Sequence, residues 1–131
     1  MITGFYACVL VVLYMQLSLK IVGLRRRHKV SIGDGDIKEL QRAIATHSNA
    51  SQYIPISLLL LLVCELNAAN IIFLHLAGVV LVVGRFLHSQ SIVKTSFKKR
   101  VLGMQLTLFS IVSLSVVNLF IFCKNTLFSF I

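Results

Sequence analysis

Four polar side chains recur at helical spacing in the second quarter of the chain: Arg42, Thr46, Asn49 and Tyr53. Intervals of four, three and four residues place them in one narrow stripe of a helix, with Ala45 and Gln52 at its edge. Such a stripe is either a seam that hydrogen-bonds to neighbouring helices or the wall of a polar ligand site. The residues alone leave both interpretations open.

A second polar set lies further along the chain, where Arg85, His88 and Ser89 share one helical face. Arg85 falls one to two turns inside the expected end of its helix, which favours a buried partner such as an anionic ligand over contact with the membrane surface. Together the two sets offer cationic, amide, hydroxyl and phenol groups that suit a small polyanion or zwitterion. A cation in such a cluster would also stabilise a thiolate.

Several other chemistries lack the residues they need. The four histidines are scattered and none pairs with a carboxylate at metal-ligand spacing, so no metal is expected. Gly33-Asp34-Gly35 lacks the strand, the lysine and the spacing of a phosphate-binding loop. The carboxylates form no catalytic pair, because three lie near one loop and Glu65 lies at the other membrane face. The three cysteines are isolated in apolar runs, which favours buried packing for all of them.

The elements that must position these groups are membrane helices. The chain is 57% hydrophobic and has four acidic residues among 131, too few for the surface of a water-soluble domain of this size. Its apolar stretches reach the length of about 20 residues that a spanning helix needs. We therefore expect a single all-α domain over residues 1–131, a polytopic membrane four-helix bundle. The expected helices cover residues 2–24, 37–66, 71–91 and 101–123.

Two of these helices carry further signals. Pro55 lies inside the second and predicts a kink, because proline removes a backbone donor. Asp34 or Asp36 is expected to cap the start of the same helix. The fourth helix carries a stripe of small and polar residues that predicts close packing on a neighbouring helix, formed by Gly103, Thr107, Ser110 and Asn118.

The net charge of +9 is concentrated in the loops after the first and third expected helices, whereas the loop after the second has no lysine or arginine. Basic loops of membrane proteins stay in the cytoplasm, so both termini should lie on the opposite side. This rule accounts for the charge without nucleic acid, which is not expected as a partner. Membrane lipids are the expected surroundings.

Three short motifs resemble those of one family. Residues 42–55, Arg-Ala-Ile-Ala-Thr-His-Ser-Asn-Ala-Ser-Gln-Tyr-Ile-Pro, are similar to the second-helix signature of MAPEG proteins, the membrane-associated proteins in eicosanoid and glutathione metabolism. Gly84-Arg85-Phe86-Leu87-His88 and Arg100-Val101-Leu102-Gly103-Met104 resemble the Gly-Arg-x-x-His and Arg-x-x-Gly-Met stretches of bacterial members. The resemblance extends over the whole chain in length, helix count and loop charge. It points to a small bacterial branch, and hence to a bacterial inner membrane.

The resemblance implies a homotrimer that binds glutathione between adjacent subunits near the cytoplasmic face. By motif, the second helix would contribute Asn49, Gln52 and Tyr53 to the glutathione site, and the third would contribute Arg85 and His88. Arg100 would be the catalytic residue that stabilises the thiolate, although the basic run also allows Lys99 in that role. Arg42 would bind a carboxylate of the ligand or pair with Glu39.

A membrane glutathione transferase or peroxidase acting on apolar electrophiles or lipid substrates is the function that the resemblance implies. Gln52 stands where the family usually has Glu, and Ala45 replaces an arginine that many members carry. These departures motivate an alternative, a non-catalytic MAPEG-like protein that binds lipid or a partner protein. A small four-helix transporter is less favoured, because proton coupling needs a membrane-embedded carboxylate and Glu65 lies at a helix end.

Overall fold

Four long helices make up nearly all of the computed structural model, which describes residues 1–93 and 96–128. In chain order they are α1 (Ile2–His28), α2 (Lys38–Leu66), α3 (Ile71–Val93) and α4 (Phe97–Phe128). Each contains a stretch long and apolar enough to cross a membrane. No strand occurs within the described ranges. The predicted all-α, four-helix membrane bundle is therefore confirmed.

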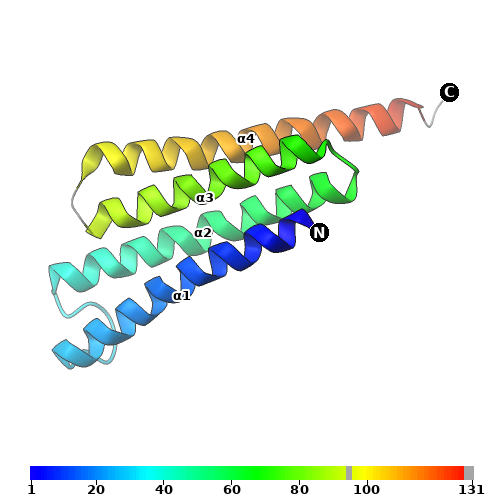
Figure 1. The fold of residues 1–131 in the computed structure, drawn as a ribbon. Helices are drawn as coiled ribbons and strands as arrows, with labels where there is room; N and C mark the ends of the chain where they lie inside the picture. Colours follow the sequence, from blue (N-terminus) through cyan, green and yellow to red (C-terminus); the bar gives the residue numbers. More distant parts are fainter. Residues whose placement is uncertain (94–95, 129–131) are drawn as a thin grey trace.

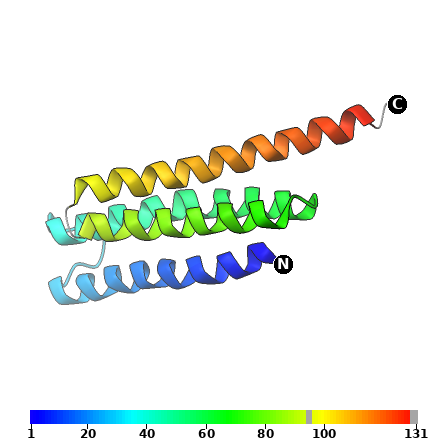
Figure 2. The same ribbon diagram turned by 45° about the horizontal axis from the view of Figure 1, so that its top comes forward.

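The middle of the bundle is formed by α2 and α3, with α1 and α4 on opposite sides (Figures 1 and 2). Successive helices run antiparallel, so both chain termini lie at the same end of the bundle (Figure 1). The other end carries the cations that close α1 and open α4, and we call it the basic end: Arg25, Arg26, Arg27, Lys29, Lys98, Lys99 and Arg100. With all four helices crossing the membrane, the two chain termini therefore lie on one side of it and the basic end on the other.

Two helices extend further than hydropathy suggested. α1 continues past residue 24 to His28, and Lys29 then closes it in a left-handed conformation with φ 56°. α4 begins at Phe97 instead of 101, so Lys98, Lys99 and Arg100 form its first turn instead of a loop. Lysine and arginine are good helix formers, and cations at the end of α1 also interact favourably with the helix dipole. Loss of hydrophobicity therefore marks the end of the lipid-embedded part, while the helix itself continues.

The turn before α2 differs from its expected form. Neither Asp34 nor Asp36 caps the helix, since Ile37 occupies the N-cap position and makes no side-chain bond. The Asp34 carboxylate instead accepts a hydrogen bond of 3.0 Å from the backbone N–H of Asp36, inside the turn. Gly33 and Gly35 adopt positive φ angles of 75° and 55° there, a conformation that glycine tolerates without strain. Further along, α2 continues unbroken through Pro55.

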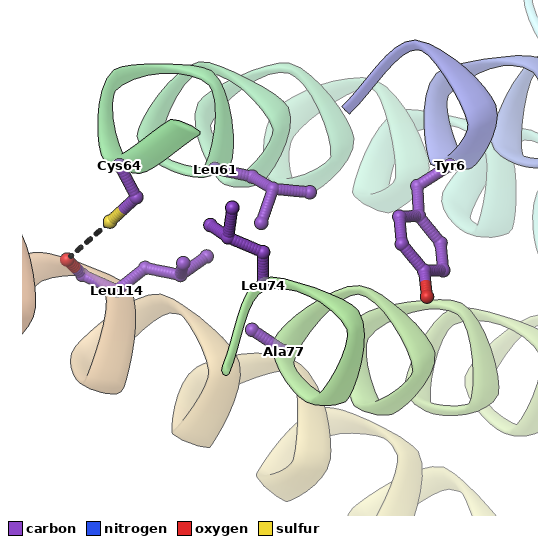
Figure 3. Packing of buried hydrophobic residues seen from close by; sticks show 6 residues of the cluster. All are labelled: Tyr6, Leu61, Cys64, Leu74, Ala77 and Leu114. Atoms are coloured by element: carbon purple, nitrogen blue, oxygen red, sulfur yellow. Dashed lines mark hydrogen bonds between the residues drawn. The ribbon is translucent and has the colours of Figure 1, made fainter. Parts of the chain in front are cut away.

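The hydrophobic core follows the α2–α3 layer along the bundle. Figure 3 shows its part near the chain termini, where Leu61 and Cys64 of α2 face Leu74 of α3 and Leu114 of α4. The Cys64 thiol donates to the Leu114 carbonyl at 3.6 Å. Burial is thus confirmed for Cys64, but the prediction was wrong for Cys8 and Cys123, which are exposed. These two lie on outward helix faces that are as apolar as the core, because lipid surrounds them, so an apolar run cannot distinguish the two settings.

The predicted packing stripe of α4 is confirmed. Ser110 donates its hydroxyl to the Ala77 carbonyl of α3 at 3.1 Å, and Asn118 donates its amide to the Leu60 carbonyl of α2 at 3.0 Å. Thr107 is fully buried. The stripe therefore joins α4 to both central helices through small side chains and interhelical hydrogen bonds.

Candidate functional site

Arg85 is the centre of the polar cluster in the middle of the bundle. Its side chain has no exposed surface, although it is the longest of the fully buried side chains. One guanidinium nitrogen, Nη2, donates to the Asn49 Oδ1 of α2 at 2.7 Å. The guanidinium carbon also lies 5.7 Å from the centroid of the Tyr53 ring, a cation–π distance. Arg85 of α3 is thus joined to two residues of the α2 stripe.

The partners of Arg85 satisfy only part of its hydrogen-bonding capacity. Its Nε and Nη1 atoms are buried and have no hydrogen-bond partner. The four acidic residues of the chain lie elsewhere. Three are in the segment 34–39 before and at the start of α2, and Glu65 is at the opposite end of that helix. A buried guanidinium with neutral partners is costly, by several kcal/mol in typical cases. An anion that met the two free N–H groups would relieve much of that cost.

The backbones of α3 and α4 touch beside Arg85. A Cβ atom built on Gly103 would lie 2.5 Å from the backbone nitrogen of His88 and 2.7 Å from the Gly84 carbonyl oxygen. One built on Gly84 would lie 3.0 Å from the side-chain oxygen of Thr107. Only glycine at both positions permits this approach. The contact therefore holds the backbone of α3 against α4 at the residue before Arg85.

His88 and Arg100 lie at the basic end of this contact. His88 follows Arg85 by one helical turn and is 3% exposed. Arg100 precedes Gly103 by three residues, so it shares the face of α4 that meets His88, while its side chain remains exposed. A ligand that reached from the basic end towards Arg85 would pass this pair.

The structure brings together some of the predicted site residues and leaves others apart. Asn49, Tyr53 and Arg85 form one cluster, and His88 lies next to it. Arg42 and Gln52 are exposed on α2, and no described contact joins them to Arg85. Their assignment to a ligand site, like that of Arg100, stays a prediction.

Thr46 belongs to the predicted stripe and is buried inside the bundle. It is 1% exposed and donates its hydroxyl to the Arg42 carbonyl of its own helix at 2.7 Å. Because α2 contacts all three other helices, residues of the stripe serve the packing of the bundle as well as the Arg85 cluster.

Two histidines that looked scattered in the sequence join helices in the structure. His47 of α2 shares a hydrogen bond of 3.0 Å with the Ser18 hydroxyl of α1, and its ring lies 4.6 Å from that of Tyr14. The Tyr6 hydroxyl donates to the backbone carbonyl of His75 at 3.0 Å. The spacing of Tyr14 and Ser18, four residues apart on one helix face, is the signal that could have indicated the α1–α2 contact.

Glu65 has a structural role that the sequence did not reveal. At the end of α2 its carboxylate accepts hydrogen bonds from the first backbone N–H groups of α1, at Ile2 and, at 2.8 Å, at Thr3. These donors have no partner within α1, and a negative charge there also suits the helix dipole. The carboxylate that a proton-coupled transporter would need is therefore occupied in capping a helix.

Comparison with known proteins agrees with this architecture. The MAPEG family matches residues 3–120 of the chain. The chain is 36% identical over 129 residues to the inner membrane protein YecN of Escherichia coli K12, covering 98% of both chains. The protein of the same name in Escherichia coli O6:H1 matches equally well. Together with the four apolar helices, these matches identify a multi-pass protein of a bacterial inner membrane, and the chain belongs to the MAPEG family.

Proposed function

We propose that the protein binds glutathione at Arg85, Asn49 and Tyr53 and either conjugates it, through its sulfur, to apolar electrophiles that enter from the membrane or uses it to reduce lipid peroxides. The observation that carries this proposal is the fully buried Arg85, two of whose nitrogen atoms, Nε and Nη1, have no hydrogen-bond partner. Glutathione has two carboxylates, and a charge-assisted pair with a guanidinium is about twice as strong as a neutral hydrogen bond. Asn49 and Tyr53 would hold the guanidinium in position for that contact.

The proposed site would be completed by a second copy of the chain. From Gln52 towards the C-terminal end of α2, the outward face of the helix is apolar. Ile56, Leu59 and Val63 are exposed there by 45%, 55% and 38%. Packing of α2 against the same helix in other subunits would cover this stripe, as expected of a homotrimer. Arg42 and Gln52 would then lie at a subunit boundary beside Arg85, where they could contact the peptide part of the ligand.

The proposed chemistry needs a thiolate close to the lipid. Arg100 is exposed at the start of α4 and would pair with the sulfur after its proton has passed to solvent. The thiolate would attack an electrophilic carbon that enters from the bilayer, forming the carbon–sulfur bond while the leaving group departs with the electron pair. With a lipid hydroperoxide, the thiolate would instead attack the terminal oxygen, so that the O–O bond breaks and the lipid leaves as an alcohol after taking a proton from solvent. A second glutathione thiol would then attack the resulting sulfenic acid, forming glutathione disulfide and releasing water.

Glutathione binding to the detergent-purified protein, measured by calorimetry, is the direct test. We expect saturable binding that Arg85→Met abolishes, because it removes the buried donors, and that Asn49→Ala abolishes, because it removes the acceptor that holds the guanidinium in place. Arg27→Met, which removes an exposed arginine near the end of α1, is the matched control and should bind like the wild type. Helix content and assembly size, followed by circular dichroism and size exclusion, establish that the variants remain folded.

The result also separates the two functional alternatives. Gln52 is exposed and neutral, so it can accept a hydrogen bond from the glutathione ammonium but offers no negative charge to pair with it. Absence of binding at millimolar glutathione would overturn the proposal and favour a non-catalytic protein that binds lipid or a partner. If binding is present, loss of the thiolate absorbance in Arg100→Ala, with intact binding of S-methylglutathione, would assign Arg100 its role.

A further inference from the structure

A cationic hollow lies at the basic end, away from Arg85. It is a shallow, open depression of about 340 Å³, bordered by the last turns of α1 and the segment that follows them. Six residues line it, of which three are cationic and none is acidic: Val22, Arg25, Arg26, Lys29, Val30 and Ser31. Because α1 makes no contact with α4, the hollow is on the opposite side of the bundle from the Gly103 contact.

The cationic side chains of this hollow do not cap the C-terminal end of α1. The backbone N–H of Lys29 and that of Val30 already satisfy the carbonyls of Arg26 and Arg25, so the end of α1 is capped without any side chain. Arg25 donates one long hydrogen bond of 3.4 Å, from Nη2 to the Gly33 carbonyl. Its Nε is buried and has no hydrogen-bond partner. The hollow therefore presents positive charge without a described anion.

An apolar stripe leads from the hollow along α1 into the membrane. Val11, Met15 and Val22 are exposed by 56%, 51% and 43%, and they occupy the same face of the helix as Arg26 and Lys29. Leu19, 63% exposed, lies at the edge of the stripe. The positive charge at the membrane surface suits the phosphate group of a phospholipid, and the apolar stripe beside it suits an acyl chain.

We propose that this hollow binds one anionic phospholipid, with its phosphate against Arg25, Arg26 and Lys29 and an acyl chain along Met15 and Val22. The lipid comes from the leaflet at the basic end, where basic residues attract anionic headgroups. A soluble phosphate compound would use the cations but leave the apolar stripe unused, so the lipid is the better fit. The site does not depend on glutathione binding, because it shares no residue with the Arg85 cluster.

Native mass spectrometry of the detergent-purified protein with added lipid tests the proposal. We expect one phosphatidylglycerol per chain at saturation, and affinity for phosphatidylcholine with the same acyl chains that is lower by about tenfold or more. The double variant Arg26→Gln/Lys29→Gln should lower phosphatidylglycerol affinity by about tenfold or more, since each cation near the surface contributes about fivefold. Both side chains are exposed, so the fold should tolerate the change.

The matched control removes two charges at the same end but outside the hollow. Lys38→Gln/Lys98→Gln should leave phosphatidylglycerol affinity within about twofold of the wild type, since neither residue lines the hollow. Met15→Ala/Val22→Ala should weaken binding of the lipid and not that of glycerol 3-phosphate.

Three results would overturn the proposal. Equal losses in the two charge variants would indicate general surface attraction instead of a site. Glycerol 3-phosphate binding as tightly as the lipid would indicate a soluble ligand. A change of assembly size in Arg26→Gln/Lys29→Gln would show that the hollow is a contact between subunits.

Discussion

The contact between Gly103 and the backbone of α3 makes a quantitative prediction about stability. Gly103→Ala inserts a methyl group where the nearest atoms are the His88 nitrogen at 2.5 Å and the Gly84 oxygen at 2.7 Å. These are backbone atoms of a helix and cannot rotate away, so the helices must separate. Overpacking typically costs 1–3 kcal/mol, and we expect about 3 kcal/mol here. Alanine regains about 1 kcal/mol of helix propensity, which leaves a net loss of about 2 kcal/mol.

Gly23→Ala provides the matched comparison for this prediction. Gly23 lies inside α1, and a Cβ atom there would meet nothing within 4 Å. The same gain in helix propensity applies, so this variant should be more stable than the wild type by about 1 kcal/mol. The difference between the two variants, about 3 kcal/mol, then isolates the overpacking itself. Unfolding in mixed micelles of dodecyl maltoside and dodecyl sulfate, followed by circular dichroism, measures both.

The outcome at Gly103 also bears on the candidate site. Because α3 carries Arg85 and His88, a forced separation of α3 and α4 should weaken glutathione binding as well as stability. Equal stabilities of Gly103→Ala and Gly23→Ala would refute the close approach of the two helices.

The remaining predictions concern the charged groups. In the absence of ligand, the free energy of unfolding of Arg85→Met should be about 1–4 kcal/mol higher than that of the wild type, because the variant removes a buried cation that lacks an anion. A lower free energy of unfolding in the same micelle assay would contradict this. Tyr53→Phe should keep glutathione affinity, while Tyr53→Leu should lower it by about 2- to 30-fold through loss of the cation–π contact; equal calorimetric affinities of the two would exclude that contact. Glu65→Gln should destabilise the bundle by about 1 kcal/mol, since a charged acceptor at the start of α1 becomes neutral, without any effect on glutathione binding. For topology, a phosphatase fused to the C-terminus should be active and a fluorescent protein at the same position dark, because the basic end is predicted to be cytoplasmic; the reverse pattern would overturn the predicted orientation.

Hydropathy predicts the helices of this protein well and their ends less well. The four spans follow from the length of the apolar runs, because lipid tolerates no unpaired backbone group. The ends at His28 and Phe97 lie outside those runs, in basic segments that form helix for reasons of propensity and dipole. The caps were missed because Asp34 bonds within its own turn, and because the N-terminal donors of α1 are met by Glu65, from a residue more than 60 positions away.

The position of a side chain around a helix was the harder part of the site to predict. The burial of Arg85 follows from its depth within the span, and helical spacing correctly grouped Asn49 with Tyr53. The same spacing also included Thr46, which is buried and donates its hydroxyl within its own helix. The rotation of α2 is set by its contacts with three neighbours, and spacing on one helix does not by itself identify which side chains meet Arg85.

Arg85 is the residue whose presence the fold itself does not explain. Replacement of a buried, incompletely paired cation by an apolar side chain usually stabilises a protein, so packing alone would favour leucine or methionine here. Its side chain is fully buried, and the low polarity of that setting makes the unpaired N–H groups more costly. The same low-polarity surroundings strengthen the attraction to any anion that enters. A site that is unfavourable when empty and favourable when filled is what a binding function requires, and ligand binding should therefore raise the stability of the wild type while leaving Arg85→Met unchanged.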